Sequence, residues 1–133
     1  MKGYVDNKYV SSILHRSSLN LLNYSGQKYN WSRGNSSNKL FEYLASGKPV
    51  LSTVKMGYDI LERYECGLSA NETTPEEIAL KISKIMALGE NDYQVMAANA
   101  RKAAEDFDIP KLADKYLSEI DRLMARTKTS KGE

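Results

Sequence analysis

A helix that stops just before a buried strand is the feature that most constrains the fold of this chain. It lies within residues 36–53, which read SSNKLFEYLASGKPVLST. Residues 36–38 are of the types that cap helix starts, whereas Gly47 and Pro49 end a helix and keep it from resuming. Residues 50–53 have the composition of a short buried strand. Such a helix–stop–strand sequence is typical of an α/β fold.

The expected helix has two faces. Its apolar stripe, which must pack on a sheet, consists of Leu40, Phe41, Leu44 and Ala45. Lys39 and Glu42 lie on the polar side, one turn apart. Their simplest interpretation is a solvated ion pair that contributes about 0.2–0.5 kcal/mol. The functional alternative is that Lys39 neutralises a phosphate while Glu42 accepts hydrogen bonds from sugar hydroxyls, because the first turn of a helix carries unpaired N–H groups that attract anions.

Strands and helices alternate along the rest of the chain, so we expect a parallel sheet flanked by helices. The expected strands are a strand end at 4–5, then 19–22, 50–53 and an edge strand at 67–70. The expected helices begin near positions 7, 36, 59, 74, 91 and 108, with Asn7 as the first cap. Ligands in such folds bind beyond the carboxyl ends of the strands. The loop after the strand at 19–22 leads to the polar helix start, so both arguments select the same place.

Three of the later helices carry their own start signals. Thr74 is a cap that precedes Pro75, and Glu77 has the spacing that closes a capping box. A second capping box is expected from Asn91 and Gln94, and Asp108 is the expected cap of the last helix. The first of these helices should bury Ile78, Ile82, Ile85 and Met86. The last carries apolar residues at helical spacing, namely Leu112, Tyr116, Leu117, Ile120 and Leu123.

Residues 24–35 form a polar loop of twelve residues without helical or strand periodicity. Ordered loops of this length inside compact domains are often functional. Tyr29 and Trp31, beside Lys28 and Arg33, suit stacking on a base or sugar ring, or contact with a further domain. An exposed loop held in place by one aromatic residue is equally compatible with the sequence.

Residues 37–51, SNKLFEYLASGKPVL, resemble the nucleotide-sugar-binding segment of retaining glycosyltransferases with the GT-B fold. The resemblance is closest to the group-1, glycogen-synthase-like enzymes that build bacterial surface polysaccharides. Residues 17–24, 67–68 with 75–79, and 107–116 resemble neighbouring elements of the same family. The resemblance implies an incomplete Rossmann-like parallel sheet, the second half of the family's C-terminal domain.

The resemblance also implies roles for five residues. The donor diphosphate would be held by the backbone amides of Ser36, Ser37 and Asn38, with Lys39 on the phosphate side. Glu42 would bind the ribose of the nucleotide. The expected donor is a UDP- or GDP-sugar, and we assign no catalytic residue, metal site or cofactor to this chain.

Two departures separate this chain from a whole enzyme of the family. Many members carry an earlier glutamate that contacts the donor sugar, with seven residues between it and the ribose-binding one, but this chain has Gly34 there. The chain also covers only the later part of the family's second domain. We therefore expect residues 1–126 to be a partial donor-binding domain, residues 127–133 to be a disordered tail, and the isolated chain to be inactive.

The expected partners follow from this interpretation. They are a nucleotide sugar and the family's N-terminal domain, which holds the acceptor site. A sheet without its early strands would expose the edge of the strand at 19–22, and an unpaired apolar edge recruits another chain. We therefore also expect self-association through this edge.

Composition argues against several other functions. The net charge is +2 with both signs mixed, which gives no footprint for nucleic acid. Cys66 is the only cysteine and is expected to be a buried structural thiol, and His15, the only histidine, is interpreted as structural or exposed.

We expect no signal peptide and no membrane span, because no segment approaches the ~18 apolar residues that a span needs. The expected location is therefore cytoplasmic. The resemblance adds a peripheral association of the parent enzyme with the inner face of the membrane. The basic residues near the C-terminus give this only weak support; they are Arg122, Arg126, Lys128 and Lys131.

The sequence leaves three functions open. The first is the donor-binding part of a retaining glycosyltransferase, in which the helix start and nearby cations stabilise the diphosphate leaving group. The second is a nucleotide-sugar epimerase of the same fold, against which the SNKLFEY string argues. The third is a non-catalytic α/β module that binds a partner through its exposed edge and its long last helix. Nucleotide binding distinguishes the first from the third.

Overall fold

Three short parallel strands form the centre of the molecule. The computed structural model describes residues 4–24, 31–35 and 37–129. β1 (Asn20–Leu22), β2 (Val50–Ser52) and β3 (Gly67–Ser69) lie in sequence order within one sheet, and both pairings are parallel. The expected α/β class with a parallel sheet flanked by helices is confirmed. Because such a sheet is shared by many α/β folds, the assignment to the GT-B fold stays a prediction.

The main core lies between the sheet and helices α2 (Asn38–Ala45), α3 (Ile60–Arg63) and α5 (Glu90–Asp106). Every residue of β2 is buried, as expected for the central strand of a parallel sheet covered on both faces. The apolar stripe of α2 buries Leu40 and Leu44. Alanines allow α5 to pack closely on α2; those that are buried are Ala97, Ala100 and Ala103.

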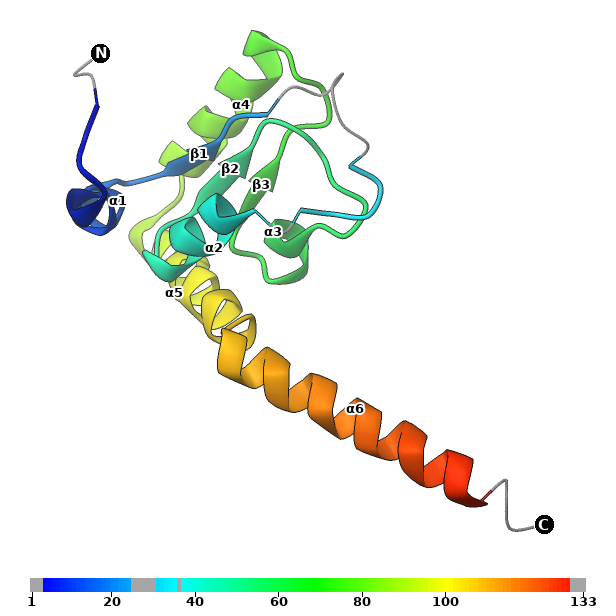
Figure 1. Cartoon of the computed structure of the whole chain (residues 1–133). Coiled ribbons are helices and arrows are strands. Elements are labelled where there is room, and N and C mark those ends of the chain that lie inside the picture. The colour runs from blue at the N-terminus through cyan, green and yellow to red at the C-terminus, as the bar shows by residue number, and fades with distance from the viewer. Residues whose placement is uncertain (1–3, 25–30, 36, 130–133) are drawn as a thin grey trace.

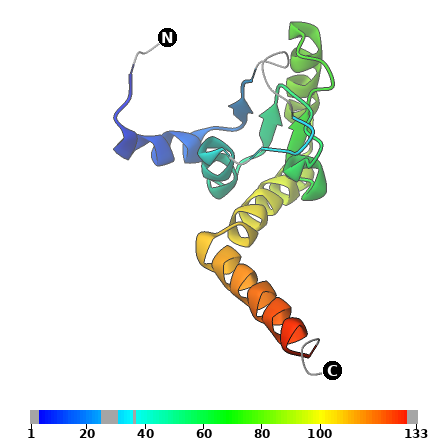
Figure 2. The same cartoon turned by 45° about the vertical axis from the view of Figure 1, so that its right-hand side comes forward.

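Helix α4 (Pro75–Met86) lies on the sheet face opposite α2 (Figures 1 and 2). Thr74 caps it as predicted, because its Oγ1 accepts a hydrogen bond from the Glu77 N–H at 3.3 Å. The Glu77 carboxylate accepts from the Asn71 N–H at 3.4 Å, so it supports the preceding turn instead of closing the predicted capping box. Met86 is 79% exposed, and its predicted burial is wrong because the helix ends at this residue.

The N-terminal segment differs from the sequence expectation. Residues 4–5 belong to no strand, and Tyr4 is 94% exposed. A 3₁₀ turn, η1 (Asn7–Tyr9), leads into helix α1 (Val10–Arg16). Asp6 caps this turn in place of Asn7, because the Asp6 Oδ1 accepts from the Lys8 N–H at 3.3 Å. A carboxylate one position earlier therefore takes the role that the sequence assigned to the amide.

The last two helices form as predicted, and only the start of the first and the end of the second differ from the prediction. Gly89 is the N-cap of α5, and Gln94 donates to Glu90 Oε1 at 2.8 Å instead of forming the predicted box with Asn91. Helix α6 (Ile109–Thr129) starts at the expected position, since the Asp108 carbonyl accepts from the Leu112 N–H at 3.0 Å. The Asp108 carboxylate accepts from the adjacent Ile109 N–H at 3.1 Å.

The structure shows α6 projecting from the α/β unit (Figures 1 and 2). The helix also includes residues 127–129, which we expected to belong to the irregular tail. The rest of that predicted tail, residues 130–133, lies outside the described residues.

Candidate functional site

A small hydrogen-bond network fixes the start of α2 at the carboxyl end of β1. The Tyr24 hydroxyl lies 2.6 Å from Ser37 Oγ and accepts a hydrogen bond from Asn35 Nδ2 at 3.1 Å. Asn35 Oδ1 in turn accepts from the Ser37 N–H at 2.8 Å. Thr53, which directly follows β2, binds both the N–H and the carbonyl of Tyr24. The ends of β1 and β2 thereby hold the first turn of α2 in place.

The predicted anion site lies at this first turn. Ser36 is outside the described residues, and Ser37 is the N-cap. The Ser37 side chain faces Tyr24 and makes no capping hydrogen bond, whereas its carbonyl accepts from the Leu40 N–H at 3.1 Å. Within the described part of the chain, no acceptor meets the N–H groups of Asn38 and Lys39. These two donors are therefore available to an anion.

Lys39 and Glu42 are both exposed on the polar side of α2. Among the described residues, no ion pair joins their side chains. The simple interpretation of a solvated i,i+3 pair is therefore not what the structure shows. The two charges are left to act separately, the cation near the helix start and the carboxylate one turn further on.

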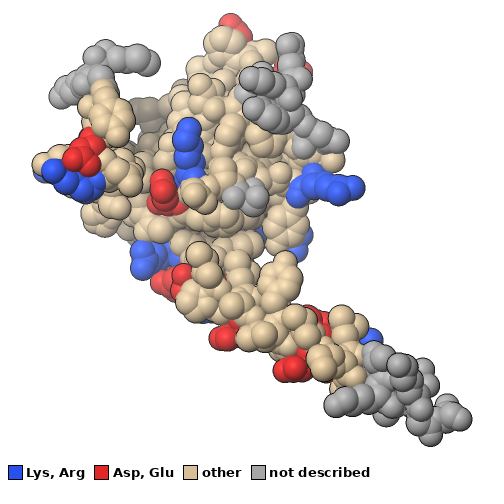
Figure 3. All heavy atoms as spheres, viewed as in Figure 1, with Lys and Arg blue, Asp and Glu red and all other residues tan. Residues whose placement is uncertain are grey.

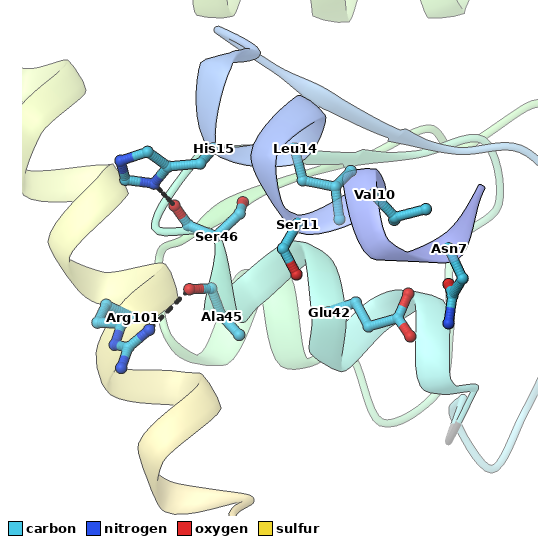
Figure 4. Close-up of a pocket in the computed structure, with 9 residues that line it drawn as sticks. All are labelled: Asn7, Val10, Ser11, Leu14, His15, Glu42, Ala45, Ser46 and Arg101. Carbon is cyan, nitrogen blue, oxygen red and sulfur yellow. Dashed lines mark hydrogen bonds between the residues drawn. The ribbon is translucent and has the colours of Figure 1, made fainter. Parts of the chain in front are cut away.

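Glu42 lines a cavity of about 500 Å³ between α1 and α2. Figure 4 shows its carboxylate in the space between the two helices, on the side of the cavity where Asn7 also lies. Ser11, Val10 and Leu14 of α1 form the facing wall. A volume of this size is ordinary for a small-molecule site, and this one combines three apolar side chains, Val10, Leu14 and Ala45, with several polar ones.

The other end of the cavity lies at the C-terminus of α2, where Ala45, Ser46, His15 and Arg101 line it (Figure 4). Arg101 of α5 donates to the Ala45 carbonyl at 2.8 Å, and His15 Nδ1 lies 3.3 Å from the Ser46 carbonyl oxygen. A cation at the last carbonyls of a helix satisfies orphan acceptors and opposes the negative end of the dipole. Arg101 therefore stabilises the C-terminal end of α2 by its charge and its hydrogen bond, and the His15 ring adds a hydrogen-bond contact with the same end.

Position 34 lies beside this network and does not accept a side chain. Gly34 has φ +94°, and a Cβ at this position would lie 2.8 Å from the carbonyl oxygen of Tyr58. A residue with a side chain would be strained in this conformation and would also meet backbone. The local backbone therefore leaves no room for the glutamate that many members of the resembled family carry at this position.

The described part of the 24–35 loop is held by its aromatic residues. The rings of Tyr24 and Trp31 pack with centroids 4.8 Å apart, and Trp31 is half-buried. This favours the interpretation in which an aromatic residue holds the loop. Tyr29 and Lys28 lie outside the described residues, and Arg33 is exposed.

Sequence reasoning missed the residues that position the site. The sequence analysis places Tyr24 and Asn35 in a loop and gives them no role. Asn35 could have been found, because an Asn two positions before a helix cap often accepts a hydrogen bond from the backbone two residues on. Arg101 had no local signal, because it lies 56 positions from its partner Ala45.

No group of three or more His, Cys, Asp or Glu residues in the described ranges is placed to hold a metal ion. Asp59 and Glu62, which follow β2, each have a structural contact nearby. Asp59 Oδ1 caps α3 by accepting from the Leu61 N–H at 2.9 Å, and Glu62 forms an ion pair with Lys55 at 2.9 Å.

None of the described helices combines the length and apolar character needed to cross a membrane.

No protein-family model, curated protein or solved structure matches this chain. The family suggested by residues 37–51 therefore stays a prediction. The functional argument rests on that local resemblance and on the geometry around the start of α2.

Proposed function

We propose that this chain is the donor-binding part of a retaining glycosyltransferase and that it binds a nucleoside-diphosphate sugar. The observation that carries the proposal is the position of Glu42. Its carboxylate faces a cavity of about 500 Å³ and lies one turn from a helix start whose N–H groups at 38 and 39 meet no acceptor among the described residues. A carboxylate and an anion site at this separation suit the ribose and the diphosphate of one nucleotide.

The first turn of α2 would hold the diphosphate. The N–H groups of Asn38 and Lys39 point out of the helix start, where the dipole is positive. The Lys39 ammonium lies on the same polar side and adds a full positive charge. In glycosyl transfer the diphosphate is the leaving group, so donors fixed here would stabilise the negative charge that develops as the glycosidic bond breaks.

Glu42 and the cavity would take the nucleoside. The ionised carboxylate accepts hydrogen bonds only, which matches the two hydroxyls of a ribose. Val10 and Leu14 offer half-buried apolar surface for a base, and Asn7 and Ser11 offer hydrogen-bonding groups at the same wall. These groups suit any base, and uracil and guanine are the two expected from the resemblance.

Two observations favour the alternative of a non-catalytic interaction module. Helix α6 carries a row of exposed apolar side chains, and the position of the family's sugar-contacting glutamate is occupied by Gly34. A module of this kind would bind a protein and would not respond to nucleotides. Nucleotide binding therefore decides between the two.

The test is titration of the isotope-labelled chain with UDP, GDP and ADP, followed by amide NMR shifts. We expect saturable shifts at Asn38, Lys39 and Glu42 with one preferred base. Glu42→Ala should raise the dissociation constant about tenfold through the loss of charged hydrogen bonds. The matched control is Glu72→Ala, which removes an exposed carboxylate from the turn before α4 and should leave the affinity unchanged. Absence of saturable shifts with all three nucleotides at millimolar concentration would refute the proposal.

A further inference from the structure

Helix α1 is weakly attached to the rest of the molecule. Neither α1 nor the 3₁₀ turn before it buries a residue. Among the described residues, a single hydrogen bond joins residues 4–17 to the rest of the chain, the one between the His15 ring and the Ser46 carbonyl, and no ion pair does so. A helix of seven residues is too short to be stable by itself. It therefore belongs to the part of the structure that opens readily.

The position of α1 in the molecule agrees with this weak attachment. Figures 1 and 2 show the helix at the margin of the molecule, where it joins the α/β unit through the segment that enters β1. In the space-filling view of Figure 3 the same part of the chain forms a lobe at the left edge. The α/β unit therefore leaves α1 room to move.

The chain is fixed again directly after α1. Ser17 ends the helix in an extended conformation, with φ −74° and ψ 150°. From Ser18 onward the backbone is held, because the Ser18 carbonyl accepts from the Tyr93 hydroxyl at 3.0 Å and the Asn20 N–H donates to the Pro49 carbonyl at 3.0 Å. Hinges are a few residues at the end of an element that absorb a change of backbone dihedrals. The hinge of α1 therefore lies at Ser17–Ser18.

The side of α1 that faces α2 lines the cavity beside Glu42. Val10 and Leu14 are half-buried in this wall, and Ser11 lies between them (Figure 4). Ile13 is outside the lining and is 48% exposed. The opposite wall is α2, whose apolar stripe is buried in the core. The cavity thus has one fixed wall and one wall that can move.

We infer that α1 is a lid that closes over a nucleoside bound beside Glu42. The inference rests on the proposed function, because the nucleoside is the ligand that the lid covers. Rotation at the hinge brings Val10 and Leu14 onto the base, and these contacts exist only when the ligand is bound, so binding favours the closed position. Closure also expels water from around the Glu42 carboxylate, which strengthens its hydrogen bonds to the ribose.

Amide hydrogen exchange of the full chain, followed by NMR with and without UDP, GDP or ADP, is the primary test. In the free chain the amides of α1 should exchange roughly ten times faster than those in the middle of α5, and a nucleotide that binds should slow them about tenfold. Shifts at Asn38, Lys39 and Glu42 report occupancy in the same sample. Exchange in the free chain as slow in α1 as in α5 would overturn the inference.

The same experiment separates failure of the lid from failure of the proposed function. Saturable shifts at Asn38, Lys39 and Glu42 without protection of α1 would mean that the nucleotide binds and the lid does not close. That result overturns the lid and leaves the proposed function standing. Absence of saturable shifts with all three nucleotides would remove the proposed function, and the lid would be refuted with it.

Truncation of the cavity side of α1 tests the contacts of the lid. Val10→Ala with Leu14→Ala keeps good helix formers at both positions. This variant should raise the dissociation constant about tenfold, chiefly through faster release, because the lid contacts exist only in the complex. Ile13→Ala is the matched control, since it shortens an apolar side chain of the same helix outside the cavity, and it should leave release unchanged. Equal effects of the two variants would contradict the lid.

A distance measurement follows the motion itself. Spin labels are attached at Ile13→Cys on α1 and at Ala98→Cys, an exposed position of α5, while the fully buried Cys66 stays unlabelled. We expect a broad distribution of distances in the free chain that narrows when nucleotide saturates the site. A narrow distribution that nucleotide leaves unchanged would show that α1 is fixed and would overturn the inference.

Discussion

The thiol of Cys66 is enclosed at the start of β3. It is fully buried, and its Sγ lies 3.8 Å from the Ile60 carbonyl oxygen, to which the thiol donates. Burial raises the pKa of this thiol to about 12, well above the ~8.5 of a free cysteine. The thiolate is therefore nearly absent in the folded state at neutral pH, which excludes Cys66 as a nucleophile.

The raised pKa predicts a pH dependence of folding stability. Above pH ~8.5 the unfolded chain loses the thiol proton and the folded chain keeps it, so the free energy of unfolding should fall by up to about 1.4 kcal/mol per pH unit. Below that pH both states hold the proton and the contribution is constant. Urea unfolding at steps from pH 7 to pH 10 measures the decline.

Cys66→Ala is the control for this decline. Its stability is lower at every pH because a cavity is left, but the decline between pH ~8.5 and ~10 should be absent. Burial also raises the pKa of Tyr43, Tyr64 and Tyr93, and their contribution has the same sign but begins near pH 10. An equal decline in the alanine variant would show that another group is responsible.

Two glycines with positive φ give a second prediction at the residue scale. Gly34 has φ +94° and Gly47 has φ +65°. A Cβ added at Gly34 would lie 2.8 Å from the Tyr58 carbonyl oxygen, whereas a Cβ added at Gly47 would meet no atom within 4 Å. We expect Gly34→Ala to cost roughly 2–3 kcal/mol of stability and Gly47→Ala about 1 kcal/mol. Urea unfolding compares them, and equal costs would contradict the predicted collision with Tyr58.

At the scale of elements, packing between α2 and α5 depends on small side chains. Ala100 is fully buried against the core, whereas Ala98 is exposed on the same helix. Ala100→Leu should therefore cost about 1–3 kcal/mol through overpacking, and Ala98→Leu should change stability by less than about 0.5 kcal/mol. Chemical denaturation of both variants tests this. If Ala100→Leu were as mild as its control, the two helices would not be closely packed.

Elements with strong local signals were predictable from the sequence. Gly47 and Pro49 stop α2 before β2, and Thr74 starts α4, because turn and cap chemistry is decided within a few residues. Neither predicted capping box formed, and the second could not form because α5 begins earlier than expected, with Gly89 as its N-cap and Asn91 inside the helix. The side chains of Glu77 and Gln94 had other partners within reach, Asn71 and Glu90, and spacing alone does not rank competing partners.

The candidate site was predictable only in part. The positions of Lys39 and Glu42 on the polar face of α2 follow from helical spacing. The cavity beside Glu42 does not, because its other walls come from α1 and from Arg101 of α5. Contacts between residues far apart in sequence depend on how whole helices pack, and local patterns carry little of that information.

At the scale of the whole molecule, stability is distributed unevenly. Buried residues concentrate in β1–β3, α2, α3 and the middle of α5, whereas every described side chain of α6 except Leu112 is exposed. Most of the stability of a helix in a protein comes from tertiary packing of its apolar face, which α6 largely lacks among the described residues. In a single chain α6 should therefore open far more readily than α5.

Hydrogen exchange on the full chain measures this difference. The amides of α6 should exchange rapidly, while those around Ala97, Ala100 and Ala103 in α5 stay protected. Ala100→Leu, which disturbs the packing of α5, should speed exchange in α5 and leave that in α6 unchanged. If the amides of α6 exchanged as slowly as those of α5, the uneven distribution of stability inferred from burial would be wrong.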